Sequence, residues 1–207
     1  MDTKEIIMTL HRGMHQYNQS GRDLNIESYI YALTRWAFEH VTPDELSDLR
    51  LLDIGCDYGY SIQAHKSKFK SAVGLEPNKG TRPFPEIDHL IFESPLSLEQ
   101  LDIHQPMGGE DSFVLMNHVL EHLLRPVDAL KMINEHPSIR YFLVAVPDAE
   151  KADKDFVYRK SHLSIYTEDW FDITGDHILS NFECVAGKSI SLRDEKFEIW
   201  RLYRRMM

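Results

Sequence analysis

The sequence contains little cysteine and no long apolar run. Only two of its 207 residues are cysteines, Cys56 and Cys184. Two cysteines do not make a disulfide framework, so a reducing cytoplasm is the expected compartment. No segment approaches the ~20 consecutive apolar residues that a membrane-spanning helix needs, and the first residues lack the apolar core of a signal peptide. We therefore expect a cytoplasmic protein that has no membrane partner.

Positive charge is also scarce. Lysine and arginine number 23 against 33 aspartate and glutamate residues, a formal net charge of −10. Surfaces that bind nucleic acids are built from clustered lysine and arginine, so this balance predicts no nucleic acid partner. The hydrophobic content of 43% is enough to fill the core of one domain.

What the sequence does contain is a short apolar run that ends in a glycine turn. Residues 51–61 read Leu-Leu-Asp-Ile-Gly-Cys-Asp-Tyr-Gly-Tyr-Ser, which is typical of a strand, a tight turn and the start of a helix. Gly55 and Gly59 suit such a turn because its backbone must adopt left-handed angles and a ligand lies directly against it. The pattern predicts the opening of a nucleotide-binding α/β unit.

The acidic residues near this turn indicate which ligand it binds. A second apolar run, about 20 residues later, ends in Glu76, where a carboxylate can bind both hydroxyls of a ribose. Asp53 and Asp57 would repel the pyrophosphate of NAD but attract an ammonium and a sulfonium. S-adenosylmethionine carries adenine, ribose and both cationic groups without a phosphate. It is therefore the predicted cofactor, with S-adenosylhomocysteine as its product.

Together with three later segments, these motifs resemble a class I S-adenosylmethionine-dependent methyltransferase. The later segments are residues 111–123, with Val-Leu-Glu-His-Leu at their end, and residues 142–147 and 162–166. They match small methyltransferase-domain families in which the fourth strand runs into a Val-Leu-Glu-His-Leu helix. One departure is Asp57, where these families usually have glycine. Aspartate tolerates unusual backbone angles better than most residues, so the change bears on cofactor affinity and leaves the turn intact.

The resemblance, and the alternation of strands and helices, imply an α/β fold. We expect a doubly wound, Rossmann-like, seven-stranded and mostly parallel sheet that ends in a C-terminal antiparallel hairpin. Residues 1–45 are predicted to form an N-terminal helical cap and residues 46–207 the S-adenosylmethionine-binding domain, within a single structural domain overall.

Ligands of such sheets bind at the carboxyl ends of the strands. In the family, the segment before the first strand lends an aromatic residue to the cofactor, and a polar residue after the third strand holds the adenine. The predicted cofactor-binding residues are Asp53, Gly55, Cys56, Asp57, Gly59, Glu76, Pro77, Glu93, Ser94, Asn117 and Tyr17.

Two histidines are the predicted catalytic bases. Methyl transfer to oxygen, nitrogen or carbon requires removal of a proton, for which histidine is the usual choice. His118 directly follows the fourth strand, and His162 enters from the long loop after the fifth. An enzyme that only aligns its substrates, without a base, is the alternative. The acceptor is predicted to be a small molecule, with its atom undecided, and the protein to be a monomer or a homodimer.

Two other functions are compatible with the same residues. The segment His118-Val-Leu-Glu121-His122 matches the H-x-x-E-H pattern of inverted zinc peptidases. That pattern needs a long helix and a third ligand well downstream, and it leaves the glycine turn unexplained, so no metal site is predicted. Because Asp57 departs from the family pattern, the sequence is also compatible with a catalytically degenerate domain that binds the cofactor and acts through a partner.

Overall fold

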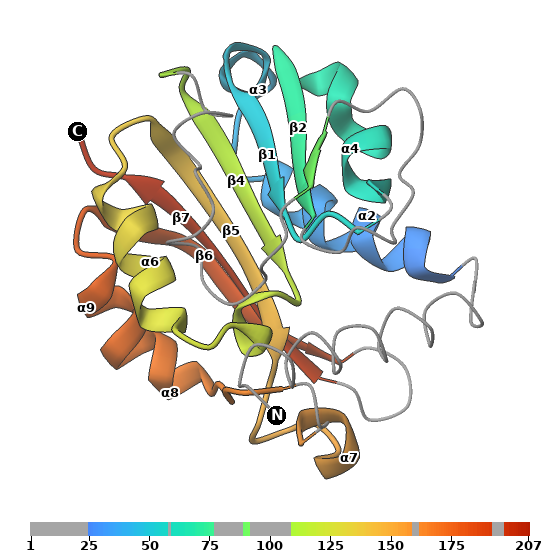
Figure 1. The fold of residues 1–207 in the computed structure, drawn as a ribbon, viewed down its shortest axis with the longest axis vertical. Coiled ribbons are helices and arrows are strands. Elements are labelled where there is room, and N and C mark those ends of the chain that lie inside the picture. Colours follow the sequence, from blue (N-terminus) through green and yellow to red (C-terminus); the bar gives the residue numbers. More distant parts are fainter. Residues whose placement is uncertain (1–24, 58, 77–88, 92–108, 159–161, 192–196) are drawn as a thin grey trace.

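The computed structural model describes residues 25–57, 59–76, 89–91, 109–158, 162–191 and 197–207. These residues form one seven-stranded sheet of order β3-β2-β1-β4-β5-β7-β6 (Figure 1). The strands are β1 Arg50–Ile54, β2 Ser71–Glu76, β3 His89–Ile91, β4 Ser112–Asn117, β5 Ile139–Pro147, β6 Phe182–Ser191 and β7 Phe197–Arg205. Strand β7 runs antiparallel to both β5 and β6, whereas the other pairs are parallel. The predicted α/β fold and C-terminal hairpin are confirmed.

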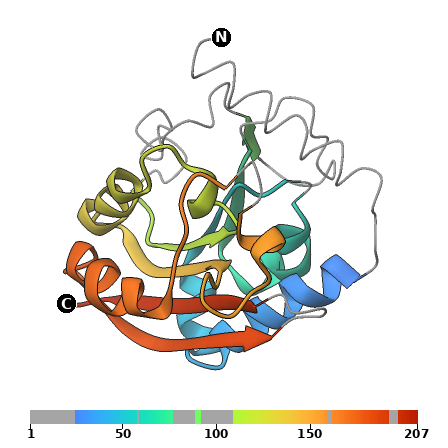
Figure 2. The ribbon, with the colours of Figure 1, turned by 90° about the horizontal axis from the view of Figure 1, so that it is seen from below.

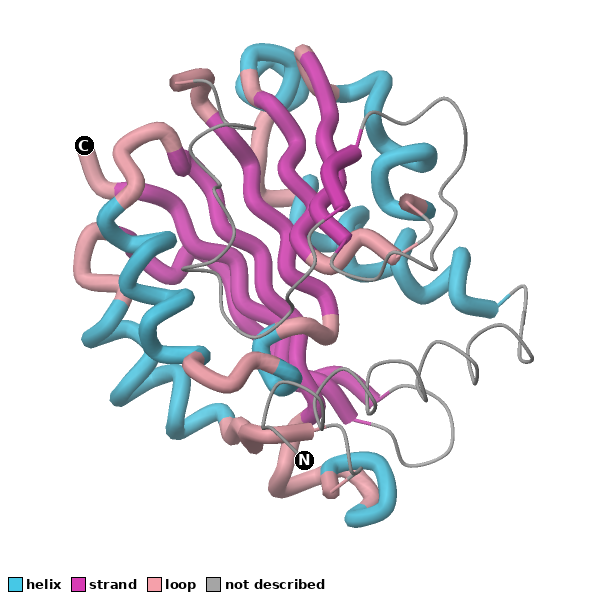
Figure 3. Tube along the Cα trace, in the orientation of Figure 1, coloured by secondary structure: helices cyan, strands magenta, loops and turns pink. Residues whose placement is uncertain are grey.

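Helices cover both faces of this sheet (Figures 1 and 3). The helices α6, α8 and α9 lie on one face, and α2, α3 and α4 on the other. Thr42 begins α3 with a capping box in which its hydroxyl accepts from the Glu45 amide and Glu45 accepts from Thr42 in return. The α-helices are α2 Asn25–Phe38, α3 Pro43–Asp48, α4 Tyr60–His65, α6 Pro126–Glu135, α7 Lys154–Val157, α8 Glu168–Trp170 and α9 Asp176–Ile178.

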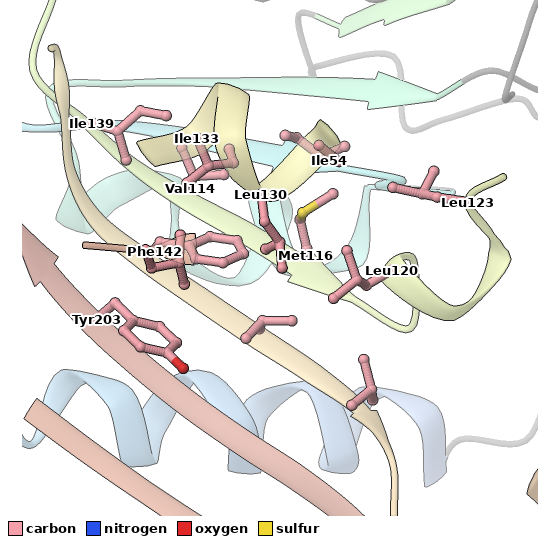
Figure 4. Close-up of a cluster of buried hydrophobic side chains, with 14 of the residues drawn as sticks. Ile54, Val114, Met116, Leu120, Leu123, Leu130, Ile133, Ile139, Phe142 and Tyr203 are labelled. Atoms are coloured by element: carbon pink, nitrogen blue, oxygen red, sulfur yellow. The ribbon is translucent and has the colours of Figure 1, made fainter. Parts of the chain in front are cut away.

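Alternate residues of the central strands point into two separate hydrophobic cores. In the core under α6, Val114 and Phe142 meet Leu130 and Ile133 (Figure 4). The neighbouring strand residues, such as Phe113, belong to the opposite core beneath α2 and α4. A strand that is buried on both faces has no polar side, which is why β4 and β5 read as continuous apolar runs.

Helix α2 lies against the second core. Leu33 and Ala37 are fully buried there, and Thr34 hydrogen-bonds to His65 at the end of α4. The predicted cap, residues 1–45, is described only from residue 25 onward, and its boundary at residue 45 stays a prediction. Within the described ranges, every helix falls short of the length and apolar character that crossing a bilayer requires.

The prediction that β4 runs directly into a helix is wrong. His118 adopts a left-handed φ of 54°, which no α-helix accommodates. A single 3-10 turn follows, Leu120–His122, and α6 begins only at Pro126. Proline lacks the amide hydrogen and fits the first position of a helix, which explains the new start there. His118 and His122 therefore do not share a helix face.

Candidate cofactor and acceptor site

The turn after β1 has the backbone geometry that its residues predicted. Gly55 and Gly59 adopt left-handed φ angles of 74° and 80°, and Asp57 adopts 46°. The Gly55 amide donates to the carbonyl of Leu75 at 2.7 Å, which fastens the turn to β2. Asp57 thus occupies a conformation in which glycine is more usual, as its place in the turn indicated.

The space at Gly55 is occupied by the loop that follows β4. A Cβ at this position would lie 2.4 Å from Val119 Cγ2, far closer than two carbon atoms approach. The sequence suggested that the ligand excludes a side chain here; in the structure the protein already does so. The loops after β1 and β4 are therefore in direct contact at the carboxyl edge of the sheet.

We expect Gly55→Ala to destabilise the fold by about 1–3 kcal/mol, because it adds both a clash and left-handed strain. Gly109→Ala is the matched control, since Gly109 has a φ of 76° but nothing within 4 Å of an added Cβ. Both variants carry the cost of left-handed strain, but only Gly55→Ala carries the cost of the clash, so urea unfolding of the two separates these costs. Equal losses of unfolding free energy would show that the contact with Val119 is unimportant.

Three carboxylates lie around the turn. Glu76 is buried at the end of β2, and its Oε2 accepts a hydrogen bond from the Asp57 amide at 2.9 Å. Burial raises the pKa of Asp53 to about 7, with the charges of Glu76 and Asp57 adding to the rise and a hydrogen bond from Ser61 opposing it. A cationic ligand would reduce the repulsion among these groups, whereas a pyrophosphate would increase it. The site fits the predicted cofactor in this respect.

Cys56 fills the space between the turn and β2. A Cβ on Gly74 would lie 2.4 Å from its Sγ, and burial raises the pKa of the thiol far above its ordinary value. Its side chain is a packing group, and cofactor binding by this residue stays a prediction. The predicted contacts Tyr17, Pro77, Glu93 and Ser94 lie outside the described residues.

His118 is held between two buried carboxylates. It follows Asn117, the last residue of β4, and its Nδ1 lies 2.9 Å from Glu121 Oε1. Its Nε2 lies 2.6 Å from Oε1 of Glu198 on β7. Burial raises the pKa of Glu198 to about 8. Both ring nitrogens are thus engaged within the protein.

Glu198 is not among the site residues that the sequence predicted. Little signal for it was present, because β7 reads Phe-Glu-Ile-Trp-Arg-Leu-Tyr-Arg-Arg and one more charged residue does not stand out there. Only the structure shows that Glu198 is 1% exposed. Charged residues are almost never fully buried without a partner. That partner, His118, is 80 positions away in the chain and could not be identified from spacing.

His162 lies against the 3-10 turn after β4. The amides of Leu163 and Ser164 donate to the Glu121 carbonyl, at 2.7 and 3.2 Å, and so fix the loop to this turn. The ring of His162 contacts that of His122 with their centroids 4.9 Å apart. Burial lowers the pKa of His162, and its Nδ1 hydrogen-bonds to the carbonyl of Val157 at 2.8 Å.

The structure thus brings most of the described site residues to one edge of the sheet. Seen from that edge, α7 and the turn after β4 lie across the ends of the parallel strands (Figures 1 and 2). The H-x-x-E-H pattern does not form the long helix that a zinc peptidase requires, since Leu120–His122 is a single 3-10 turn. A glycine turn, a strand-end acid and two histidines remain as the features of the site.

The strand order and the glycine turn define the class of fold: it is that of class I S-adenosylmethionine-dependent methyltransferases. A methyltransferase from Archaeoglobus fulgidus that depends on this cofactor superimposes with a TM-score of 0.67 at 12% identity, covering 92% of this chain and 98% of that one. The 1,6-didemethyltoxoflavin N1-methyltransferase of Burkholderia thailandensis, solved with S-adenosylhomocysteine, gives 0.68 at 14% identity, covering 100% and 92%. These likenesses establish the fold alone.

Residues 26–178 match the family described as a methyltransferase domain, and the chain belongs to that family. In sequence it is also similar to the tRNA U34 carboxymethyltransferase of Pseudomonas aeruginosa, 32% identical over 110 residues and 48% of this chain. The match covers 33% of that protein, so the chain spans about a third of the length of the curated relatives it matches. The predicted class I methyltransferase family is confirmed.

Proposed function

We propose that this protein is a methyltransferase that uses S-adenosylmethionine to methylate a small molecule. The observation that carries the proposal is the group of three carboxylates, Asp53, Asp57 and Glu76, around a left-handed glycine turn in a chain of this family. Carboxylates placed there suit a ligand with a ribose and two cationic groups.

The residues of the chain have separate tasks in this proposal. Glu76 would hold the ribose hydroxyls, and Asp53 and Asp57 would favour the positive charge of the ligand. When bound, S-adenosylmethionine supplies a methyl group activated on a sulfonium. Removal of a proton from the acceptor falls to His118, directly after β4, or to His162, in the loop after β5. Since both nitrogens of His118 already have carboxylate partners, the geometry favours His162 for contact with a substrate.

An RNA acceptor is the second candidate, favoured by the similarity to a tRNA carboxymethyltransferase. The net charge of −10 opposes it, because binding of a phosphate backbone depends on clustered cations. A small-molecule acceptor therefore stands as the main proposal.

Calorimetric titration with S-adenosylhomocysteine tests the cofactor, with NAD as the control. We expect micromolar binding of the first and none of the second. Transfer of a radiolabelled methyl group then tests the acceptor, with bulk tRNA and the low-molecular-mass fraction of a cell extract as separate substrates. Label in the low-molecular-mass fraction supports the proposal, whereas label in tRNA would assign an RNA acceptor. Binding without any transfer would indicate the degenerate domain, and no binding would overturn the cofactor assignment.

A further inference from the structure

A carboxylate and two imidazoles converge beside the turn that follows β4. One ligand atom from each of Glu121, His122 and His162 lies within 4.8 Å of the other two. Glu121 is 1% exposed and His122 is buried, whereas His162 is half-buried and lies next to exposed residues of its loop. The group is thus anchored in the core on one side and reachable from the surface on the other.

We propose that Glu121, His122 and His162 form a binding site for a divalent transition-metal ion, zinc in the first instance. Two histidines and one glutamate are a donor set found in catalytic zinc sites, where three protein ligands leave a coordination position open. Magnesium and calcium prefer all-oxygen surroundings, so two imidazoles select against them.

Glu121 has an oxygen that the protein leaves for such an ion. Its Oε1 accepts from His118, but its Oε2 is buried and has no hydrogen-bond partner among the described residues. An unsatisfied buried oxygen of a charged group costs more than about 1–3 kcal/mol, so native structures rarely retain one without a reason. Coordination to a cation would remove that cost.

His162 is oriented as metal-binding histidines are. Its Nδ1 donates to the Val157 carbonyl at 2.8 Å, so Nε2 is the nitrogen that would bind an ion. A ligating histidine almost always donates its other ring N–H to a carbonyl or carboxylate in this way. The 2.9 Å contact from His118 supports the Glu121 carboxylate in the same manner.

The distances require a modest contraction. Ligand atoms around a tetrahedral zinc ion lie about 3.4 Å apart, since each bond is about 2.0–2.1 Å long. The ligand atoms of the three residues lie within 4.8 Å of one another. Movements of about 1 Å suffice.

This site differs from the zinc-peptidase pattern in the sequence. That pattern uses His118 and His122 as its pair, whereas both nitrogens of His118 are engaged by Glu121 and Glu198. His162, 40 positions beyond His122, takes the place of His118. The proposed site therefore also departs from the sequence prediction, which was that no metal is bound.

The place of the ion gives it a role, and that role rests on the proposed methyltransferase function. With both nitrogens of His162 engaged, by Val157 and by the ion, the ion would take over from this histidine the task of easing proton loss from the acceptor. Val119, two residues before Glu121, lies directly against the glycine turn that would hold the cofactor. An ion beside this turn could bind an oxygen of the acceptor in its open position and so hold it near the cofactor. The acceptor would then be an alcohol, a phenol or a carboxylic acid.

Metal titration of the purified full-length protein tests the site. The protein is first dialysed against a chelator. We then expect calorimetry to show one zinc ion bound per chain and no binding of magnesium. Cobalt added in place of zinc should give a visible absorption spectrum typical of low-symmetry coordination. Glu121→Gln and His162→Ala should each weaken zinc binding at least about 100-fold. His177→Ala, which removes an exposed histidine on α9, is the matched control and should change nothing.

Each variant is also titrated with S-adenosylhomocysteine and unfolded by heat, so that a folding defect is recognised. His162 is half-buried on a loop, which makes its variant the safer test if Glu121→Gln does not fold. Zinc binding that survives both substitutions, or no binding to the unmutated protein, would overturn the metal site. Cofactor binding without zinc binding refutes this inference alone, whereas zinc binding without cofactor binding refutes the proposed function alone.

Discussion

Replacing Glu76 with alanine is expected to weaken the binding of S-adenosylhomocysteine at least about 100-fold. Two hydrogen bonds from ribose hydroxyls to a carboxylate are each worth about 1.5–3 kcal/mol, and a loss of 2.8 kcal/mol is about 100-fold. The alanine also removes the acceptor for the Asp57 amide, which lies 2.9 Å from Glu76 Oε2 and helps to hold the turn. Calorimetric titration measures the loss.

Two further variants separate binding from turn stability. Glu76→Gln keeps an oxygen for the Asp57 amide but loses the charge, so we expect a loss of about 10-fold. Glu135→Ala removes an exposed glutamate at the end of α6 and should leave the affinity unchanged. If Glu76→Ala bound the ligand as tightly as the unmutated protein, the carboxylate would have no part in ribose binding.

Relative to the unmutated protein, Asp53→Asn is expected to have a more favourable free energy of unfolding at high pH than at low pH. The pKa of Asp53 is about 7 in the folded protein, against an ordinary value of 3.8. Between these two values the folded state holds one proton more than the unfolded state. The stability due to this proton is complete below about pH 4 and is lost as the pH rises through 7. Asparagine has no such proton to lose.

The difference in unfolding free energy between the variant and the unmutated protein should therefore move in favour of the variant by about 2–3 kcal/mol from pH 5 to pH 8. Urea unfolding at the two pH values measures it. A constant effect of the asparagine on the Ser61 hydrogen bond cancels in this comparison. Asp48→Asn, at an exposed position, serves as the control. A difference that does not change with pH would show that Asp53 ionises as readily in the folded protein as in water.

The glycine turn and the ends of the strands could be predicted because their signals are local. The alternation of apolar runs and turns placed β1 and β2, and the left-handed positions fell on Gly55, Asp57 and Gly59. A carboxylate at the end of β2 follows from the same pattern. These features depend on residues within about 20 positions of one another, so sequence spacing determines them.

The surroundings of His118 could not be predicted because they depend on distant parts of the chain. The left-handed φ of this residue turns its ring toward Glu198, which approaches only because β7 lies beside β5 in the sheet. His162 meets Glu121 through a loop that has no regular period. The resemblance to the family implied a helix after β4, whereas residues 120–122 form a 3-10 turn.

The interior position of β7 has a consequence for how the protein is made. This strand comes after all the others in the chain, yet it lies between β5 and β6 and supplies Glu198 to His118. During synthesis, a chain that has emerged only through β6 has an unpaired edge on β5 and an incomplete site. Contacts over such long separations form slowly. The sheet and the contact of Glu198 with His118 are therefore completed only when β7 has paired with β5, so in a ribosome-bound chain that lacks β7 we expect His118 to have Glu121 as its only carboxylate partner of the two.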